Sequence, residues 1–313
     1  MKSNKILITG GAGYIGSKLT TKLLNLNFKV TVLDALKFSS KSLNHLFNNK
    51  NFVFIKGDVR NKKLIKSLIG KNDFIIPLAA LVGAPICEKN KKEAISVNLD
   101  SIKYMMNNIK KNKKIIYLTT NSGYGVGKKN KYCTEKSPLN PISLYGRTKI
   151  EAEKIIMKSK NSIGFRLATV FGYSYRMRTD LLINNFVFTS LKTEKLSLFE
   201  PHFRRNYIHV NDVVDGIIYS LKNFNHLKSN VYNLGLSSAN LTKLMLAKKI
   251  RKQIKKLKIK IIMDRKDPDQ RDYYVSNKKI EKKGFKAKTS VEDGIAELIK
   301  VFSNNSEKII NNY

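Results

Sequence analysis

A tyrosine and a lysine stand four residues apart, at Tyr145 and Lys149, in a segment (144–158) whose apolar spacing predicts a helix. Residues at this spacing share one helix face, so the ammonium group can approach the phenol. A free tyrosine has a pKa of about 10 and is a poor base at neutral pH, but a neighbouring positive charge favours its phenolate. The pair could therefore accept a proton from a hydroxyl group. By itself, such a pair is more often an ordinary surface contact.

A glycine-rich turn lies near the start of the chain. The sequence Gly-Gly-Ala-Gly-Tyr-Ile-Gly begins at Gly10, directly after a predicted strand (5–9), and it opens a predicted helix (14–26). In this arrangement Gly10 permits the tight turn, Gly13 lets the backbone approach a pyrophosphate, and Gly16 allows the helix to pack closely on the strand. The amides at the helix N-terminus then bind the pyrophosphate, so the motif predicts a dinucleotide site.

An acidic residue, Asp34, ends the second predicted strand (29–33), about twenty residues after the glycines. A carboxylate here accepts hydrogen bonds from the adenosine ribose and repels a 2′-phosphate, which favours NAD over NADP. Lys37 follows closely and could soften that preference. A solvated loop aspartate is the alternative.

Hydroxyl side chains follow another predicted strand (114–119), at Thr119 and Thr120. Open α/β sheets bind ligands beyond the carboxyl ends of their strands. Together with the glycine turn, these hydroxyls favour a functional reading of Tyr145 and Lys149.

The elements that must position these residues alternate between β-branched runs and amphipathic stretches. The predicted strands are residues 5–9, 29–33, 52–56, 73–77, 114–119 and 163–169. The predicted helices are residues 14–26, 92–111, 144–158, 211–221, 241–254 and 291–302, with loops at 173–179, 201–206 and 264–272. This alternation predicts an α/β Rossmann fold, a doubly wound parallel sheet with helices on both faces.

The regular alternation of predicted strands and helices ends after residue 172, which predicts two structural units. We expect an NAD-binding Rossmann domain at 1–172, with a later return near 207–235. Residues 173–313 should form mainly a smaller, interleaved C-terminal α/β lobe that binds substrate.

The net charge of +37, from 60 basic and 23 acidic residues, raises nucleic acid as a partner. Lysines supply most of this charge and are spread along the whole chain, whereas arginine is the usual residue for bidentate phosphate or base recognition. We therefore expect no specific nucleic-acid binding. The positive field should still attract an anionic small substrate.

Two cysteines, Cys87 and Cys133, are too few for a disulfide framework, and the histidines show no metal spacing. The longest apolar run (74–86) is interrupted by Pro77 and Gly83, whereas a membrane span needs about 20 residues. We therefore expect a cytoplasmic protein with no metal site and no membrane segment.

The chain resembles the extended short-chain dehydrogenase/reductase superfamily, in its branch of NAD-dependent nucleotide-sugar epimerases and dehydratases typified by UDP-glucose 4-epimerase. The resemblance covers essentially the full length. The segments that carry it are residues 9–16, 34, 57–60, 77–80, 97–98, 118–125, 145–149, 165–166, 170–172 and 205–210.

This resemblance implies a cofactor site for NAD. Asp58 and Val59 would hold the adenine. The other residues that would bind NAD are Gly10, Gly13, Tyr14, Ile15, Gly16, Asp34, Leu78, Ala79, Ala80, Tyr145 and Lys149.

The resemblance also implies a catalytic set of Thr120, Tyr145 and Lys149. Arg205 would reach the nucleotide phosphates. A second late basic contact would come from Arg271 or Arg265. We also expect Ser122 and Thr169 to contact the substrate.

Two departures from the family pattern bear on the reaction. Members that dehydrate sugars carry an Asp-Glu pair after the strand-end hydroxyl, where this chain has Asn121 and Ser122, so a 4,6-dehydratase is disfavoured. The loop after residue 172 carries Arg176 and Arg178, which could face a substrate phosphate or carboxylate or belong to a solvated turn.

The leading hypothesis is an NAD-dependent epimerase of a nucleotide-activated sugar, which acts through a transient keto intermediate with Tyr145 as general base. Lys149 would depress the pKa of that tyrosine and hold the cofactor ribose. The alternative is an NAD(P)-dependent 4-keto-sugar reductase or dehydrogenase on the same fold. A third, non-catalytic NAD-binding scaffold has no need of the Thr-Tyr-Lys set. We expect a homodimer, as the resemblance implies.

Overall fold

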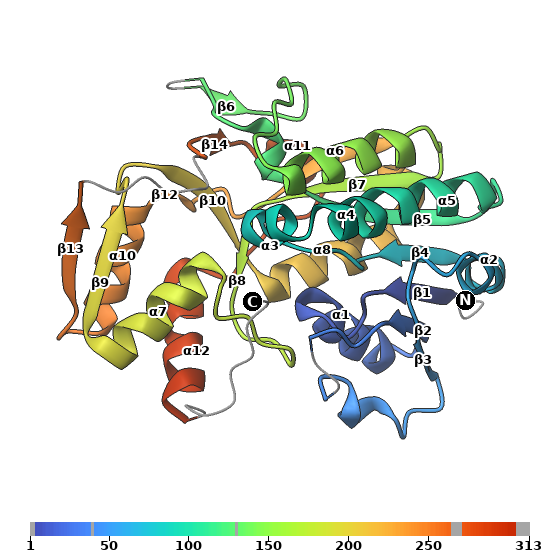
Figure 1. Ribbon diagram of the computed structural model, residues 1–313, viewed down its shortest axis with the longest axis horizontal. Coiled ribbons are helices and arrows are strands. Elements are labelled where there is room, and N and C mark those ends of the chain that lie inside the picture. Colours follow the sequence, from blue (N-terminus) through green and yellow to red (C-terminus); the bar gives the residue numbers. More distant parts are fainter. Residues whose placement is uncertain (1–3, 39–40, 129–130, 264–270, 305–313) are drawn as a thin grey trace.

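A parallel sheet of seven strands forms the centre of the computed structural model, which describes residues 4–38, 41–128, 131–263 and 271–304 (Figure 1). The strand order across the sheet is β11-β7-β5-β4-β1-β2-β3. The bounds are β1 (Lys5–Thr9), β2 (Lys29–Asp34), β3 (Phe52–Lys56), β4 (Phe74–Pro77), β5 (Lys114–Thr120), β7 (Ser162–Leu167) and β11 (Asn230–Leu234). The order reverses between β1 and β4, which is where doubly wound sheets bind their ligands.

Strand β1 shows why the sheet is buried on both faces. Ile6 and Ile8 point to the face covered by α1 (Tyr14–Asn25) and α8 (Val210–Lys222), and Leu7 points to the opposite face. All three side chains are fully buried, because successive strand residues alternate between two covered faces.

A second layer of helices covers the face of the sheet to which Leu7 points. This layer contains α2 (Lys62–Lys71), α3 (Ala84–Lys89), α4 (Lys91–Ile95), a π-helical turn (Ser96–Asp100), α5 (Ser101–Asn108) and α6 (Leu144–Ile156). Single 3-10 turns occur at Asn44–Leu46 and Asn121–Tyr124.

A smaller group of elements lies beside the large sheet (Figure 1). Its strands are β8 (Thr169–Phe171), β10 (Arg204–His209) and β12 (Asn240–Thr242), then β9 (Lys195–Phe199) with β13 (Lys258–Ile262), and β6 (Tyr132–Cys133) with β14 (Tyr274–Val275). Its helices are α7 (Leu182–Thr193), α10 (Lys243–Gln253) and α12 (Val291–Asn304). Two short helices, α9 (Phe224–Leu227) and α11 (Lys278–Glu281), contact the large sheet instead, α9 at β4 and α11 at β11. The predicted α/β Rossmann-type fold is confirmed, and the domain boundary at residue 172 stays a prediction.

Strand β7 is shorter than predicted. The predicted strand over 163–169 is divided at Ala168, where the chain leaves the large sheet and β8 pairs with β10 instead. Conversely, β11 returns from the later part of the chain to pair with β7. Apolar content cannot reveal such a change of partner, because both segments are buried.

Three other predicted elements also differ in detail. The helix predicted over 92–111 is broken by the π-helical turn. The helix predicted over 241–254 begins only after Thr242, whose hydroxyl accepts from the Met245 amide as an N-cap. The predicted loop over 201–206 ends in the first residues of β10, and most of the predicted loop over 264–272 lies outside the described residues.

None of the helices within the described ranges has both the length and the apolar character needed to cross a bilayer.

Candidate active site

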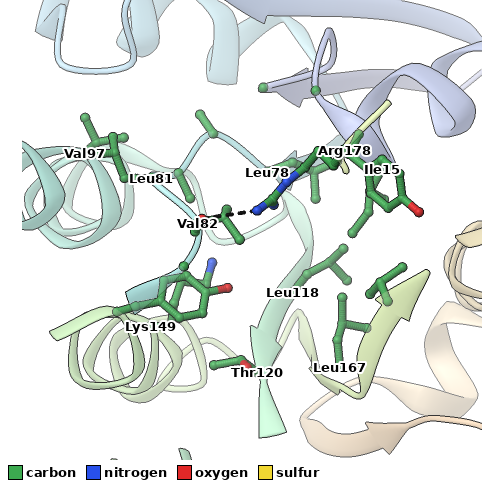
Figure 2. A pocket seen from close by; sticks show the side chains of 18 of the residues that line it. Ile15, Leu78, Leu81, Val82, Val97, Leu118, Thr120, Lys149, Leu167 and Arg178 are labelled. Carbon is green, nitrogen blue, oxygen red and sulfur yellow. Dashed lines mark hydrogen bonds between the residues drawn. The ribbon is translucent and has the colours of Figure 1, made fainter. Parts of the chain in front are cut away.

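The carboxyl ends of the central strands open onto one cavity of about 860 Å³. Its wall contains every residue that the sequence predicts for catalysis, cofactor binding and substrate binding, apart from Arg265, which lies outside the described residues. Figure 2 shows Lys149 and Thr120 with Leu118 and Leu167 around this cavity. The fold therefore gathers residues that are up to 261 positions apart in the chain, from Gly10 to Arg271.

The glycine turn forms the floor at the end of β1. Gly10 has a positive φ of 73°, and a Cβ atom there would lie 2.5 Å from the Ala79 nitrogen. A Cβ atom on Gly16 would lie 2.4 Å from the Gly10 oxygen, so the helix can approach the turn only without one. Helix α1 follows Gly13 with no side-chain cap and no acidic residue in its first turn. The turn therefore fits a pyrophosphate at the helix N-terminus.

Asp34 is held firmly at the end of β2. Its carboxylate accepts hydrogen bonds from the amides of Ala12 (2.9 Å) and Leu36 (2.8 Å). Burial raises the pKa of Asp34, and these two hydrogen bonds act in the opposite direction. A carboxylate has about four acceptor positions, so the group can still accept ribose hydroxyls.

The part of the cavity wall where the resemblance places the adenine carries an ion pair. Arg60 bonds Asp58 through Nε (3.0 Å) and Nη2 (2.6 Å), and this partner lowers the pKa of Asp58. Val59 follows in the same wall. Arg60 therefore neutralises the charge of Asp58, and this part of the cavity wall stays polar.

A buried asparagine fixes the loop after β4, which carries Leu78, Ala79 and Ala80. The Asn98 side chain donates to the Leu81 oxygen (3.0 Å) and accepts from the Leu81 amide (2.8 Å). These two hydrogen bonds satisfy the backbone amide and carbonyl of Leu81, which lies beyond the end of β4. They hold the loop in place beside the cavity.

Helix α6 places Tyr145 and Lys149 on the cavity wall. It starts at Ser143, whose hydroxyl accepts from the Gly146 amide at 3.1 Å. Lys149 is only 5% exposed, and its Nζ lies 4.1 Å from the centre of the Tyr117 ring. Burial lowers the pKa of Lys149 to about 7, while Glu153 acts to raise it.

Two arginines from distant parts of the chain act on Tyr145. Burial raises the pKa of Tyr145 to about 12, and the positive charges of Arg178 and Arg271 act to lower it. The ammonium of Lys149 lies over the Tyr117 ring. The influence of Lys149 on the pKa of Tyr145 stays a prediction.

A chain of polar groups follows the end of β5. The hydroxyl oxygens of Thr120 and Ser122 lie 2.9 Å apart, and the Ser122 amide donates to the Thr120 hydroxyl (3.1 Å). Arg271 donates to the Ser122 hydroxyl. Arg205 on β10 and Thr169 on β8 complete this end of the cavity, which suits an anionic ligand.

A family model described as "NAD dependent epimerase/dehydratase family" matches residues 6–235 of this chain. The chain belongs to this family. This confirms the NAD-dependent epimerase/dehydratase family that the sequence predicts.

Curated relatives of this family member include both epimerases and dehydratases. The chain is 30% identical over 270 residues to a dTDP-D-glucose 4,6-dehydratase of Dictyostelium discoideum, which covers 79% of this chain and 61% of the relative. It is 27% identical over 328 residues to a bifunctional UDP-glucose 4-epimerase and UDP-xylose 4-epimerase of Pisum sativum, with 93% of each covered. It spans about half (48%) of a trifunctional Arabidopsis thaliana relative that includes a UDP-glucose 4,6-dehydratase.

Solved structures share the fold of this family member. The UDP-glucuronic acid 4-epimerase of Bacillus cereus, in complex with UDP-glucuronic acid and NAD, superposes with a TM-score of 0.85 at 23% identity. The match covers 96% of this chain and 99% of that one.

Two arginines of this family member were only loosely placed by the sequence. Arg176 and Arg178 are 3% and 6% exposed and line the cavity, so the alternative of a solvated turn is wrong. Arg178 bonds Asp180, and the Arg176 guanidinium lies 5.2 Å from the centre of the Phe38 ring. The Arg-x-Asp spacing at residues 178–180 is the sequence signal for this ion pair.

No group of three or more histidine, cysteine or acidic side chains within the described ranges could hold a metal ion.

Proposed function

We propose that this protein is an NAD-dependent epimerase that inverts one carbon of a nucleotide-activated sugar through a transient keto intermediate. Support comes from the cavity, which unites a pyrophosphate-binding glycine turn, a ribose-facing carboxylate at Asp34 and a Thr-Tyr-Lys set. A binding scaffold would need no buried lysine beside a tyrosine, and burying a lysine is costly.

In the proposed reaction, the Tyr145 oxygen accepts the proton of the sugar hydroxyl that becomes the keto oxygen. Thr120 orients that oxygen, since its own hydroxyl is held by Ser122 at 2.9 Å. When bound, NAD supplies the hydride acceptor and donor. Burial raises the pKa of Tyr145 to about 12 and Arg178 and Arg271 act against this rise, so we propose that the cationic nicotinamide ring of bound NAD supplies the further positive charge that favours the phenolate. After the keto-sugar turns over in the cavity, Tyr145 returns the proton.

The observation that carries epimerisation over dehydration is the pair of residues after Thr120. Elimination of water needs an acid and a base at this place, whereas Asn121 and Ser122 provide an amide and a hydroxyl. Ser122 is in addition tied to Thr120 and Arg271. Some relatives are dehydratases, but Asn121 and Ser122 lack the acid and the base that dehydration needs, so we favour epimerisation for this chain.

The sugar should carry a nucleoside diphosphate. Arg205 and Arg271 line the cavity, with Arg271 bonded to Ser122 after β5, and arginine suits bidentate binding of phosphate. The net charge of +37 favours the approach of such an anion. We further propose a homodimer in the cytoplasm, and sedimentation of the purified chain tests the dimer.

One experiment separates the three reactions. The purified protein is incubated in D₂O with a panel of UDP-, GDP-, CDP- and dTDP-sugars, without added cofactor, and products are identified by mass and NMR. An epimerase yields an isomer of unchanged mass with no deuterium at the inverted carbon, because the same hydride returns. A product that has lost the elements of water would indicate a dehydratase, and each solvent deuterium that it takes up at carbon makes the mass difference one unit smaller than 18. Oxidation of a panel sugar to its keto form, with stoichiometric reduction of added NAD or NADP, would indicate the alternative, a keto-sugar reductase or dehydrogenase running in the oxidative direction.

A further inference from the structure

The segment over residues 172–181 is fastened to the helix that follows the glycine turn. Tyr14 donates from its hydroxyl to the Gly172 oxygen at 2.6 Å, and Ser174 donates to the Tyr14 oxygen at 2.6 Å. The hydroxyls of Ser17 and Ser174 lie a further 3.1 Å apart. One edge of this segment is therefore anchored on α1, beside the proposed pyrophosphate site.

Arg178 carries the segment to the other wall of the cavity. Its Nη2 donates to the Val82 oxygen at 3.4 Å, and Val82 belongs to the loop after β4. Figure 2 shows the Arg178 guanidinium bonded to Val82. The backbone of Arg178 is tied to α1 through Asn184, whose amide donates both to the Arg178 oxygen and to the Tyr14 hydroxyl. Tyr14 and Val82 both line the cavity, so Arg178 connects its two walls.

The direction of the Arg178 side chain is set by two further groups. Asp180 accepts from Nε at 3.1 Å and also from Nη2, and the Asn184 amide donates to the Arg178 oxygen at 2.8 Å. Asn184 also accepts from the Gly172 amide at 3.0 Å, so it ties the start of the segment to Arg178. The segment therefore reaches the cavity as one braced unit.

The ion pair between Arg178 and Asp180 is buried, with 8% and 6% of the two side chains exposed. Burying two charges costs desolvation energy that a pair of apolar side chains would not incur, so such a pair is weak evidence for a stabilising role. A role in bridging the cavity explains the buried ion pair better, because the planar guanidinium of Arg178 can bond the Asp180 carboxylate and the Val82 carbonyl at the same time.

We propose that Arg178 is a positioning residue that latches the segment 172–181 to Val82 over the bound dinucleotide, so that the protein releases NAD slowly. This inference rests on the proposed function, because an epimerase reuses one cofactor molecule in every turnover and a reductase must exchange it. While the latch is closed, the groove between α1 and the loop after β4 is bridged, and the dinucleotide leaves only after the bond to Val82 breaks.

The test measures release of NAD from the full chain without any sugar. Protein loaded with NAD is diluted and desalted at timed intervals, and the retained NAD is measured by mass. Arg178→Gln should speed release by on the order of tenfold or more, the range expected for losing charge-assisted hydrogen bonds. Asp180→Asn should act in the same direction, since it frees the guanidinium.

Two further variants keep the result specific. Arg147→Gln is the matched control, because Arg147 is an exposed arginine that also donates to a loop carbonyl, that of Ile142 at 2.7 Å, without spanning the cavity. Arg147→Gln should release NAD at the wild-type rate. Arg178→Lys keeps the charge without the planar fork and should restore retention only in part. Thermal unfolding of each NAD-free variant separates loss of the latch from loss of the fold.

Wild-type release from Arg178→Gln would overturn the inference, and so would full restoration by Arg178→Lys, because charge alone would then hold the cofactor. The proposed function fails in a different way. A protein that retains NAD but converts no nucleotide sugar contradicts the function and leaves the latch intact.

Discussion

Arg166 and Glu153 form an ion pair inside the protein, with Nη2 of the arginine 2.7 Å from Oε1 of the glutamate and only 6% and 4% of the side chains exposed. Glu153 lies one helical turn after Lys149 and raises the pKa of that lysine. The Arg166 guanidinium also donates to the Tyr124 hydroxyl at 3.1 Å. This pair links β7 to the helix that carries the proposed catalytic residues.

Removing one partner of this pair should destabilise the protein strongly. Glu153→Gln leaves Arg166 charged and buried, so the free energy of unfolding should fall by about 3–5 kcal/mol. Glu151→Gln on the same helix is the control, because its ion pair with Lys154 is exposed and should contribute less than about 1 kcal/mol. Urea unfolding of both variants measures the difference, and equal losses would contradict the buried pair's importance.

Tyr145→Phe should lower turnover by about 10²–10⁴-fold, because it removes the proposed proton acceptor and keeps the ring. NAD binding and the unfolding midpoint should stay near wild type. Thr120→Val should cost less, since it removes an orienting hydroxyl rather than the base. Rates come from the nucleotide-sugar panel, and a Tyr145→Phe protein that works at the wild-type rate would exclude this tyrosine as the base.

Lys149 should make stability depend on pH. Its pKa is lowered to about 7 in the folded protein, below the usual value of 10.5. Between these values the unfolded chain binds more protons, so the free energy of unfolding should rise with pH from about 7 to about 10. Lys149→Met should remove this rise. The measurement is the difference in urea unfolding between wild type and variant at several pH values, which cancels the other lysines, and a pH-independent difference would contradict the lowered pKa.

Asp34 should set the preference between NAD and NADP. Asp34→Asn removes the charge that repels a 2′-phosphate, so the ratio of NADP to NAD affinity should rise by about tenfold or more. Asp215→Asn is the control, because Asp215 is an exposed partner of Lys22 and does not line the cavity. Calorimetric titration of NAD and of NADP into the wild-type protein and both variants measures this affinity ratio. If unmodified protein binds them equally, Asp34 does not discriminate.

Much of the nucleotide site could be predicted from the sequence because its signals are local. The turn at Gly10 requires a residue without a side chain. The apolar residues before it follow the spacing of a strand, and those after it follow the spacing of a helix. Asp34 is predictable for the same reason, since it ends a strand at a set distance from that turn. Tyr145 and Lys149 share a helix face, so their spacing alone brings them to one wall.

The tertiary structure decided what no local pattern encodes. Val82 and Arg178 are 96 positions apart, and their bond depends on how the segment before α7 lies against the loop after β4. Arg271 acts on Tyr145 although it is far away in the sequence, because electrostatic influence follows distance in space and burial, not separation along the chain. The division of one apolar run into β7 and β8 has a similar cause, since buried strands look alike whichever partner they choose. Residue spacing determined which groups could do chemistry, and packing of distant segments decided which charges surround them.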